Sequence, residues 1–182
     1  MTLITSSPTR RPHSVSSLLA QSDVRSGSVR RARIEASSPE PRQFPFDLND
    51  GTVVVEVVGD EPNWLYATLS NLQALSSMAE NWDSYGGAPT TFEATLAALN
   101  FISQYLPEEA KEPTVVPATD GGVQLEWHRL AGDLEVAFNP EGAMAAYFVD
   151  ALSGDEWEMA AGGIDPRRLA AAVDAVTVSS SN

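Results

Sequence analysis

In the second half of the chain, apolar and polar residues alternate one by one, and this pattern constrains the fold more than any other feature. The alternation runs through residues 123–128 and 134–138, and it continues in residues 144–150 and 156–159. A period of two is typical of strands that bury one face. The connections between these stretches are short and rich in turn-forming residues, which makes neighbouring strands antiparallel. Residues 114–160 are therefore predicted to form a β-meander.

The two faces of the predicted meander differ in chemistry. One face is apolar, and it needs helices to cover it. The other face is expected to point to water and to carry four glutamates, Glu126, Glu135, Glu156 and Glu158.

Before the meander, the sequence predicts one strand and two helices. Residues 52–58 are β-branched almost throughout, which indicates a strand. Pro62 suits the first position of a helix, because its ring fixes φ near the helical value. Apolar residues at helical spacing give this helix a buried stripe of Leu65, Leu69, Leu72, Leu75 and Ala79.

A second helix is predicted from the capping box of Thr90 and Glu93, in which each side chain accepts a backbone N–H in the first turn. It ends at Pro107, and a short connection favours pairing of the two helices as a hairpin. Asp165 is the expected N-cap of a last helix. The predicted fold class is α+β, an antiparallel β-meander of about four to five strands with two or three helices packed on one face.

The charge of the chain is divided between two segments. Residues 1–45 carry a net charge of +4, whereas residues 46–182 carry a net charge of −18. The first segment is rich in Arg, Ser and Pro, and its few apolar residues cannot offset the entropy lost on ordering. We predict a disordered tail over residues 1–45 and a single acidic α+β domain over residues 46–178. An organelle transit peptide and a start codon assigned too far upstream are alternative explanations of the tail.

Composition excludes several classes of function. The chain has no cysteine, which excludes thiolate and zinc–thiolate chemistry, and nothing favours an oxidising compartment, so we expect a cytoplasmic location. No run approaches the roughly 18 apolar residues of a membrane span. Lys111 is the only lysine, and it lies in a predicted loop rather than in a phosphate-binding loop. We predict no cofactor and no metal.

One candidate site lies on the polar face of the meander. His128 alternates with Glu126 on one strand, and Glu135 could face Glu126 across a hairpin. Such a group could share a proton, or contribute to a metal site if further carboxylates joined it. The plainer interpretation, which we prefer, is a solvated anionic face.

A second candidate site is the polar, aromatic segment Asn81–Pro89. Trp82 and Tyr85 bracket Asp83 just after a predicted helix end, and aromatic residues with a polar atom are frequent anchors of interfaces. The plainer and preferred interpretation is that both aromatic residues cap the hydrophobic core while Asp83 accepts a backbone N–H.

Two segments together resemble a pattern in small bacterial proteins without a characterised function. They are Asn81–Gly86 (NWDSYG) and Asp120–Trp127 (DGGVQLEW). The resemblance covers roughly residues 64–140, and the second segment is the more specific. It implies no activity, cofactor or catalytic residue.

Three functional hypotheses follow. The first is a non-enzymatic module that binds a basic protein, as an antitoxin or immunity protein does, because opposite charges attract over a Debye length. The second is a carboxylate-dependent hydrolase. The third is a DNA-associated regulator acting weakly through the Arg-rich tail, which the charge of the domain opposes. We favour the first, with candidate partner-binding residues Trp82, Asp83, Tyr85, Glu126, His128 and Glu135 and no catalytic residue.

Overall fold

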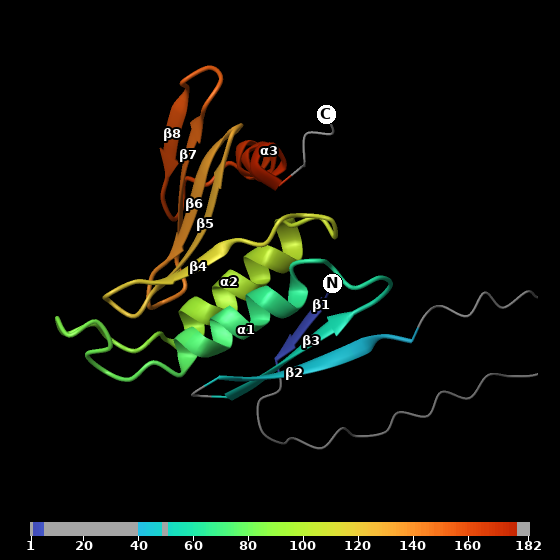
Figure 1. Ribbon diagram of the computed structural model, residues 1–182, viewed down its shortest axis with the longest axis vertical. Helices are drawn as coiled ribbons and strands as arrows, with labels where there is room; N and C mark the ends of the chain where they lie inside the picture. Colours follow the sequence, from blue (N-terminus) through green and yellow to red (C-terminus); the bar gives the residue numbers. More distant parts are fainter. Residues whose placement is uncertain (1, 6–39, 49–50, 178–182) are drawn as a thin grey trace, which may run out of the picture.

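The computed structural model describes residues 2–5, 40–48 and 51–177 (Figure 1). The elements of this described part are β1 (Thr2–Thr5), β2 (Arg42–Leu48), β3 (Gly51–Val57), α1 (Leu65–Ser76), α2 (Phe92–Tyr105), β4 (Thr114–Pro117), β5 (Val123–Arg129), β6 (Gly132–Phe138), β7 (Met144–Asp150), β8 (Glu156–Met159) and α3 (Pro166–Thr177).

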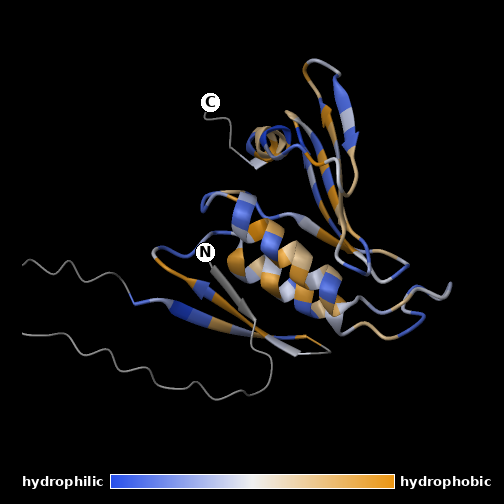
Figure 2. Ribbon diagram, turned by 180° about the vertical axis from the view of Figure 1, so that it is seen from behind, coloured by the Kyte–Doolittle hydropathy of each residue, from blue (hydrophilic) through white to orange (hydrophobic). Residues whose placement is uncertain are grey.

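The predicted meander is the larger of two sheets in the described part of the chain. Its five strands follow in the order β4-β5-β6-β7-β8, and every neighbouring pair is antiparallel. Hydrophobic and hydrophilic residues alternate along these strands (Figure 2). Helices α2 and α3 both contact β5 and β6, and they lie on the same side of the sheet (Figure 1). The α+β fold class is confirmed.

The core between this sheet and the helices is built from the apolar half of each strand. Trp127 is buried, and its Nε1 donates to the carbonyl oxygen of Lys111 at 3.1 Å. The ring of Phe101 on α2 lies 6.4 Å from that of Trp127 and 5.9 Å from that of Phe138. Burial of large side chains without loss of their hydrogen bonds is the main source of stability here.

A second sheet in the described residues was not predicted. It has three strands in the order β1-β3-β2, all antiparallel. Helices α1 and α2 lie side by side and antiparallel as the predicted hairpin, and they occupy the layer between the two sheets (Figure 1). Phe46, Val53 and Val55 are buried beneath this layer.

The predicted boundary at residue 45 does not match this second sheet. Strand β1 and the first residues of β2 fall within the range 1–45, and both strands pair with β3. Pro45 argues against a strand in the sequence, because proline has no N–H for a central β-ladder. However, β2 is an edge strand, where one side needs no ladder N–H and proline is tolerated. Residues 6–39 of the predicted tail lie outside the described residues.

The predicted starts of the first two helices need correction, whereas Asp165 accepts the N–H of Arg167 at 3.0 Å as the expected N-cap of α3. Helix α1 begins at Leu65 with Trp64 as its N-cap rather than at Pro62, and it ends at Ser76, so Ala79 lies outside it and is exposed. The N-cap of α2 is Thr91, whose side chain accepts the N–H of Ala94 at 3.2 Å. Among the described residues, no helix is both long and apolar enough to cross a membrane.

Substitution of Gly132, the first residue of β6, tests the packing of the sheet. A β-carbon there would overlap the carbonyl oxygen of Val149, so Gly132→Ala is expected to lower the free energy of unfolding by about 1–3 kcal/mol. Urea denaturation measures the change. Gly163→Ala is the matched control, because the nearest atom to its β-carbon is 3.7 Å away. Equal losses in the two variants would contradict this packing.

Candidate functional site

The face of the five-stranded sheet opposite α2 and α3, called the open face below, carries a row of acidic residues. Glu126 on β5 lies directly opposite Glu135 on β6, Glu135 lies opposite Tyr147 on β7, and Tyr147 lies opposite Glu158 on β8. Directly opposed residues point to the same face. Glu156 lies two residues before Glu158 on the same strand, so the four predicted glutamates share one face.

The next row of the open face contains His128, which lies opposite Asp133. His128 Nδ1 is 3.1 Å from Asp133 Oδ1, and His128 Nε2 is 3.2 Å from Glu126 Oε2. Gln124 Nε2 donates to Glu126 Oε1 at 3.0 Å and to Glu135 Oε2 at 3.2 Å. One hydrogen-bonded network therefore joins Asp133 to Glu135 through His128, Glu126 and Gln124.

The carboxylates on both sides of His128 change its protonation. Hydrogen bonds to Glu126 and then to Asp133 raise the pKa of His128 above its ordinary value. The protonated ring has a donor for each carboxylate, whereas the neutral ring has only one. The side chain is 56% exposed, so solvent screens these interactions.

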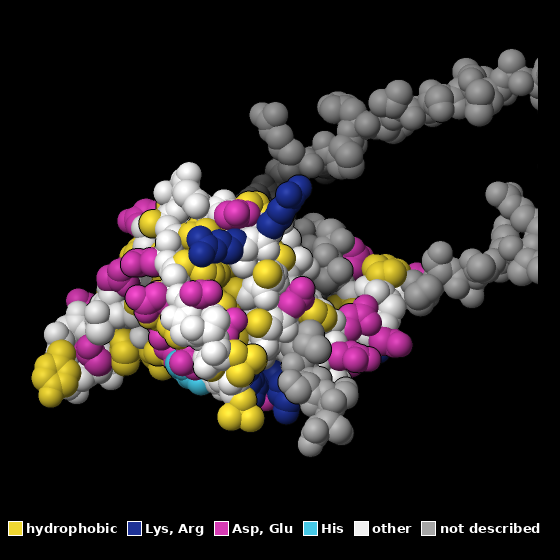
Figure 3. Space-filling view, turned by 90° about the horizontal axis from the view of Figure 1, so that it is seen from above, with side chains coloured by type: hydrophobic (Ala, Val, Ile, Leu, Met, Phe, Trp, Pro, Cys, Tyr) yellow, Lys and Arg dark blue, Asp and Glu magenta, His cyan; other side chains and the backbone are white. Residues whose placement is uncertain are grey.

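Tyr147 extends the polar surface toward β8. Its hydroxyl donates to Glu156 Oε2 at 3.1 Å, and this hydrogen bond raises the pKa of the phenol. Within the described part of the chain, no Lys or Arg forms an ion pair with the carboxylates of the open face. In Figure 3, acidic side chains lie beside the histidine on this surface. Of the residues that the structure describes, only His128, when it is protonated, offsets the charge of the face by direct contact.

The segment Asn81–Gly86 forms a loop that is held by its own hydrogen bonds. Asp83 Oδ1 accepts the N–H groups of Tyr85 at 2.8 Å and of Gly87 at 2.9 Å. These bonds lower the pKa of Asp83. Trp82 is half-buried and donates from Nε1 to the carbonyl oxygen of Ala88 at 3.1 Å. The prediction that Asp83 accepts backbone N–H groups is confirmed.

Tyr85 does not cap the core. Its side chain is 94% exposed at the tip of this loop. The positive φ of Ser84, 66°, and of Gly86, 97°, turns the chain so that the tyrosine projects outward. The preferred interpretation of Tyr85 as a core cap is therefore wrong.

The residues that follow the first segment of the resemblance are hydrogen-bonded to the β4–β5 turn, where the second segment begins. Ala88 N donates to Thr119 O, and Thr91 N donates to Gly121 O, both at 2.9 Å. Gly121 has φ of 96°, and a β-carbon there would lie 2.8 Å from Pro89 O. The loop is therefore fixed to the β4–β5 turn at one end of the open face, and it projects beyond that turn (Figure 1).

The six predicted site residues fall into two groups. Glu126, His128 and Glu135 belong to the network on the open face, and Trp82, Asp83 and Tyr85 belong to the loop. Sequence reasoning missed Asp133 and Tyr147, although the hairpin register would have placed Asp133 opposite His128. Among the described residues, no group of three His, Cys, Asp or Glu side chains is placed to hold a metal ion.

Comparison with known proteins identifies no relative of this chain. The sequence matches no protein-family model and no curated protein, and the structure matches no solved structure. The likeness to small bacterial proteins stays a resemblance carried by two segments. Function has to be inferred from the geometry of the open face and the loop.

Replacement of Glu126 tests the network around His128. Glu126→Gln should lower the pKa of His128, because it removes the carboxylate whose hydrogen bond is the largest cause of the raised value. NMR titration of the imidazole signals measures this pKa. Glu135→Gln is the control, since Glu135 has no hydrogen bond to His128, and it should change the pKa less. An unchanged pKa in Glu126→Gln would contradict the network.

The raised pKa of His128 also makes stability depend on pH. The pKa of His128 in the folded state lies above its unfolded value of about 6.5. The resulting stabilisation is fully present below about pH 6.5 and is lost as the pH rises through the folded-state pKa. Wild type should exceed His128→Gln in unfolding free energy by up to about 1 kcal/mol near pH 6 after solvent screening, and by less near pH 9. Urea denaturation at both pH values measures the difference. A constant difference would contradict it.

Asp83 is expected to control the order of the loop. Asp83→Ala removes the acceptor for two backbone N–H groups, so the amides of Tyr85 and Gly87 should exchange with solvent faster. Hydrogen exchange followed by NMR measures the rates. Glu80→Gln, an exposed change in the same connection, should leave them unchanged. Equal rates in Asp83→Ala and wild type would contradict the role of Asp83.

Proposed function

We propose that this chain is a non-enzymatic binding module whose open face docks a basic protein in the cytoplasm. The observation that carries the proposal is the pair of directly opposed carboxylates, Glu126 and Glu135, which no described Lys or Arg neutralises. Like charges directly opposite each other on neighbouring strands are destabilising. If the face were only a solvated surface, this loss of stability would bring no benefit to function.

A basic partner would supply the missing opposite charges. Lys or Arg side chains could pair with Glu126, Glu135 and Glu158, and opposed electrostatic fields would accelerate the encounter. Tyr147 within the acidic row and Tyr85 on the loop offer aromatic contacts of the kind that dominate interface energies. Both lie on elements that are fixed by hydrogen bonds.

The hydrolase hypothesis has weaker support. A general base needs a nitrogen or oxygen directed at the substrate, but both ring nitrogens of His128 face carboxylates of the sheet. The DNA hypothesis depends on the Arg-rich tail, residues 1–45, of which residues 6–39 lie outside the described residues. Within our proposal, the biological role is that of the antitoxin or immunity half of a pair, which rests on analogy with small acidic bacterial proteins.

Affinity purification with the full-length chain tests the proposal. A stoichiometric basic partner should be retained at about 0.05 M salt and released at about 0.5 M salt. With that partner, the double variant Glu126→Gln/Glu135→Gln should associate about tenfold more slowly, while dissociation changes less. Stopped-flow or surface-plasmon measurements give both rates.

The control removes the same charge elsewhere. Glu112 and Asp174 are exposed and lie outside the open face, so Glu112→Gln/Asp174→Asn should slow association much less. Absence of a stoichiometric partner at low salt would refute the proposal. Equal slowing in the two double variants would show that net charge, not the open face, steers the encounter.

A further inference from the structure

The two edge strands of the five-stranded sheet, β4 and β8, differ in whether another strand can pair with them. An edge strand carries a row of N–H and C=O groups that face away from its only neighbour and remain unpaired. In Figure 1 and Figure 2, β8 lies at the outer margin of the molecule, and no described helix or strand lies beyond it.

Proline blocks the outer edge of β4. Ala118 N donates to Gly122 O at 3.0 Å, so the backbone of Ala118 faces β5. Because inward and outward groups alternate along an antiparallel strand, the residues that face outward are Pro113, Val115 and Pro117. Proline has no N–H to donate, so two of these three positions cannot pair with a further strand.

The outer edge of β8 has no such block. Asp150 N donates to Asp155 O at 2.8 Å, so the backbone of Asp155 faces β7. By the same alternation Trp157 also faces β7, whereas the N–H and C=O groups of Glu156 and Glu158 face outward. Within the described part of the chain, no backbone hydrogen bond outside the sheet uses these four groups.

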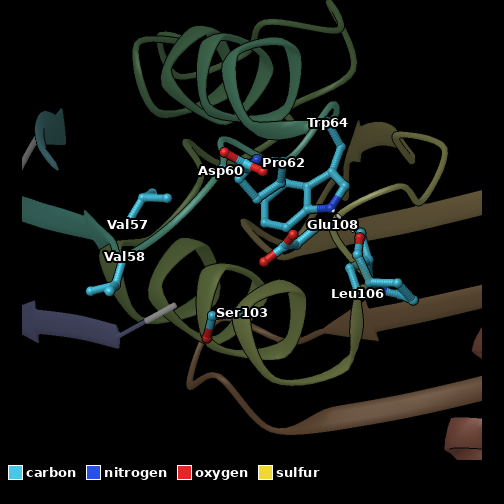
Figure 4. A pocket seen from close by; sticks show the side chains of 9 residues that line it. Val57, Val58, Asp60, Pro62, Trp64, Ser103, Leu106 and Glu108 are labelled. Carbon is cyan, nitrogen blue, oxygen red and sulfur yellow. Dashed lines mark hydrogen bonds between the residues drawn. The ribbon is translucent and has the colours of Figure 1, made fainter. Parts of the chain in front are cut away.

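Trp157 adds an apolar surface beside this edge, on the helix side of the sheet. The other three tryptophans donate the indole N–H to a backbone carbonyl oxygen: Trp64 to Pro107 (Figure 4), Trp82 to Ala88 and Trp127 to Lys111. Trp157 is half-buried, and its indole N–H has no acceptor among the described residues. Tryptophans of this kind, with one apolar and one polar side to offer, are enriched at interfaces.

The charges of β8 decide which kind of strand can pair with it. Glu156 and Glu158 are exposed, and neither forms an ion pair with a described Lys or Arg. If β8 of a second copy paired antiparallel about Trp157, Glu156 of each copy would lie opposite Glu158 of the other. Like charges directly opposite each other are destabilising. A strand with Lys or Arg at these two positions would form two ion pairs instead.

We propose that the outer edge of β8 pairs with an extended basic segment of the partner protein, which adds a sixth, antiparallel strand to the sheet. This inference rests on the proposed function and specifies how the partner docks. The segment carries Lys or Arg opposite Glu156 and Glu158, and an apolar residue between them opposite Trp157. Backbone hydrogen bonds supply affinity in this mode of recognition, and the alternating side chains supply specificity.

NMR titration of the full-length chain with a model strand tests the proposal. The probe is the acetylated and amidated peptide Thr-Lys-Val-Lys-Val-Lys-Thr at about 0.05 M salt. It should shift the amide signals of Glu156 and Glu158 saturably, with a Kd of about 1 mM or lower. Exchange of these two amide protons with solvent should slow at least about tenfold in the complex. The amide of Trp157, which already faces β7, should change less.

Backbone methylation of the peptide separates strand pairing from simple charge attraction. In the antiparallel arrangement, residues directly opposite Glu156 and Glu158 direct their own N–H groups at β8. N-methylation of the three lysines should therefore weaken binding at least about tenfold. N-methylation of the two valines and the last threonine is the matched control, because it adds the same number of methyl groups on N–H groups that face away from β8. It should weaken binding much less.

Variants of Glu158 test the same edge on the protein. Glu158→Gln removes only the charge and should weaken binding about two- to fivefold. Glu158→Pro also removes the outward N–H and should weaken binding at least about tenfold. The sheet should persist in this variant, because proline is tolerated where the N–H of an edge strand faces solvent. Unchanged amide signals of β7 verify this.

Several results would overturn the proposal. One is the absence of shifts on β8 at about 5 mM peptide. Equal weakening by the two methylated peptides, or by Glu158→Pro and Glu158→Gln, would exclude the added strand but leave the open face as a docking surface, which the affinity purification tests separately. Slow exchange of both amides in the free monomer would assign the edge to another segment of this chain. A dimer that Glu158→Pro dissociates would assign it to a second copy.

Discussion

Each strand of the five-stranded sheet pairs with its neighbour in a fixed register. A slip of one residue would exchange the two faces of the strand. Because side chains alternate between faces, such a slip on β5 would carry Glu126 into the core and expose Trp127. The two-residue loop between Arg129 and Gly132 prevents it. The buried core, the acidic row and the contact surface for α2 and α3 are all consequences of this one register.

The sequence was sufficient for the elements whose pattern is local. Period-two alternation predicted the meander, and period-3.6 stripes predicted the helices, because each pattern reflects a neighbouring buried surface. The second sheet escaped prediction, since Thr2–Thr5 is short and its partner β3 is about fifty residues away. The start of α2 was displaced by one residue, because Thr90 and Thr91 are both good N-cap residues and only the fold decides between them.

The candidate sites also divide into features that local patterns predict and features that depend on the fold. The common face of Glu126, His128 and Glu135 was predictable, because residues on one strand face follow from spacing alone. The bridging of Glu126 and Glu135 by Gln124 was not, since it depends on rotamers and on the pairing of two strands.

The junction of the loop with the β4–β5 turn makes one structural unit from two places in the chain. Pro89 O occupies the space that any side chain on Gly121 would need, and the amide of Ala88 depends on Thr119 for its acceptor. An insertion or a bulkier residue in one segment therefore requires an adjustment in the other. In homologous chains these two stretches should vary together, and a graft of either one into a foreign scaffold would lose its shape without its counterpart.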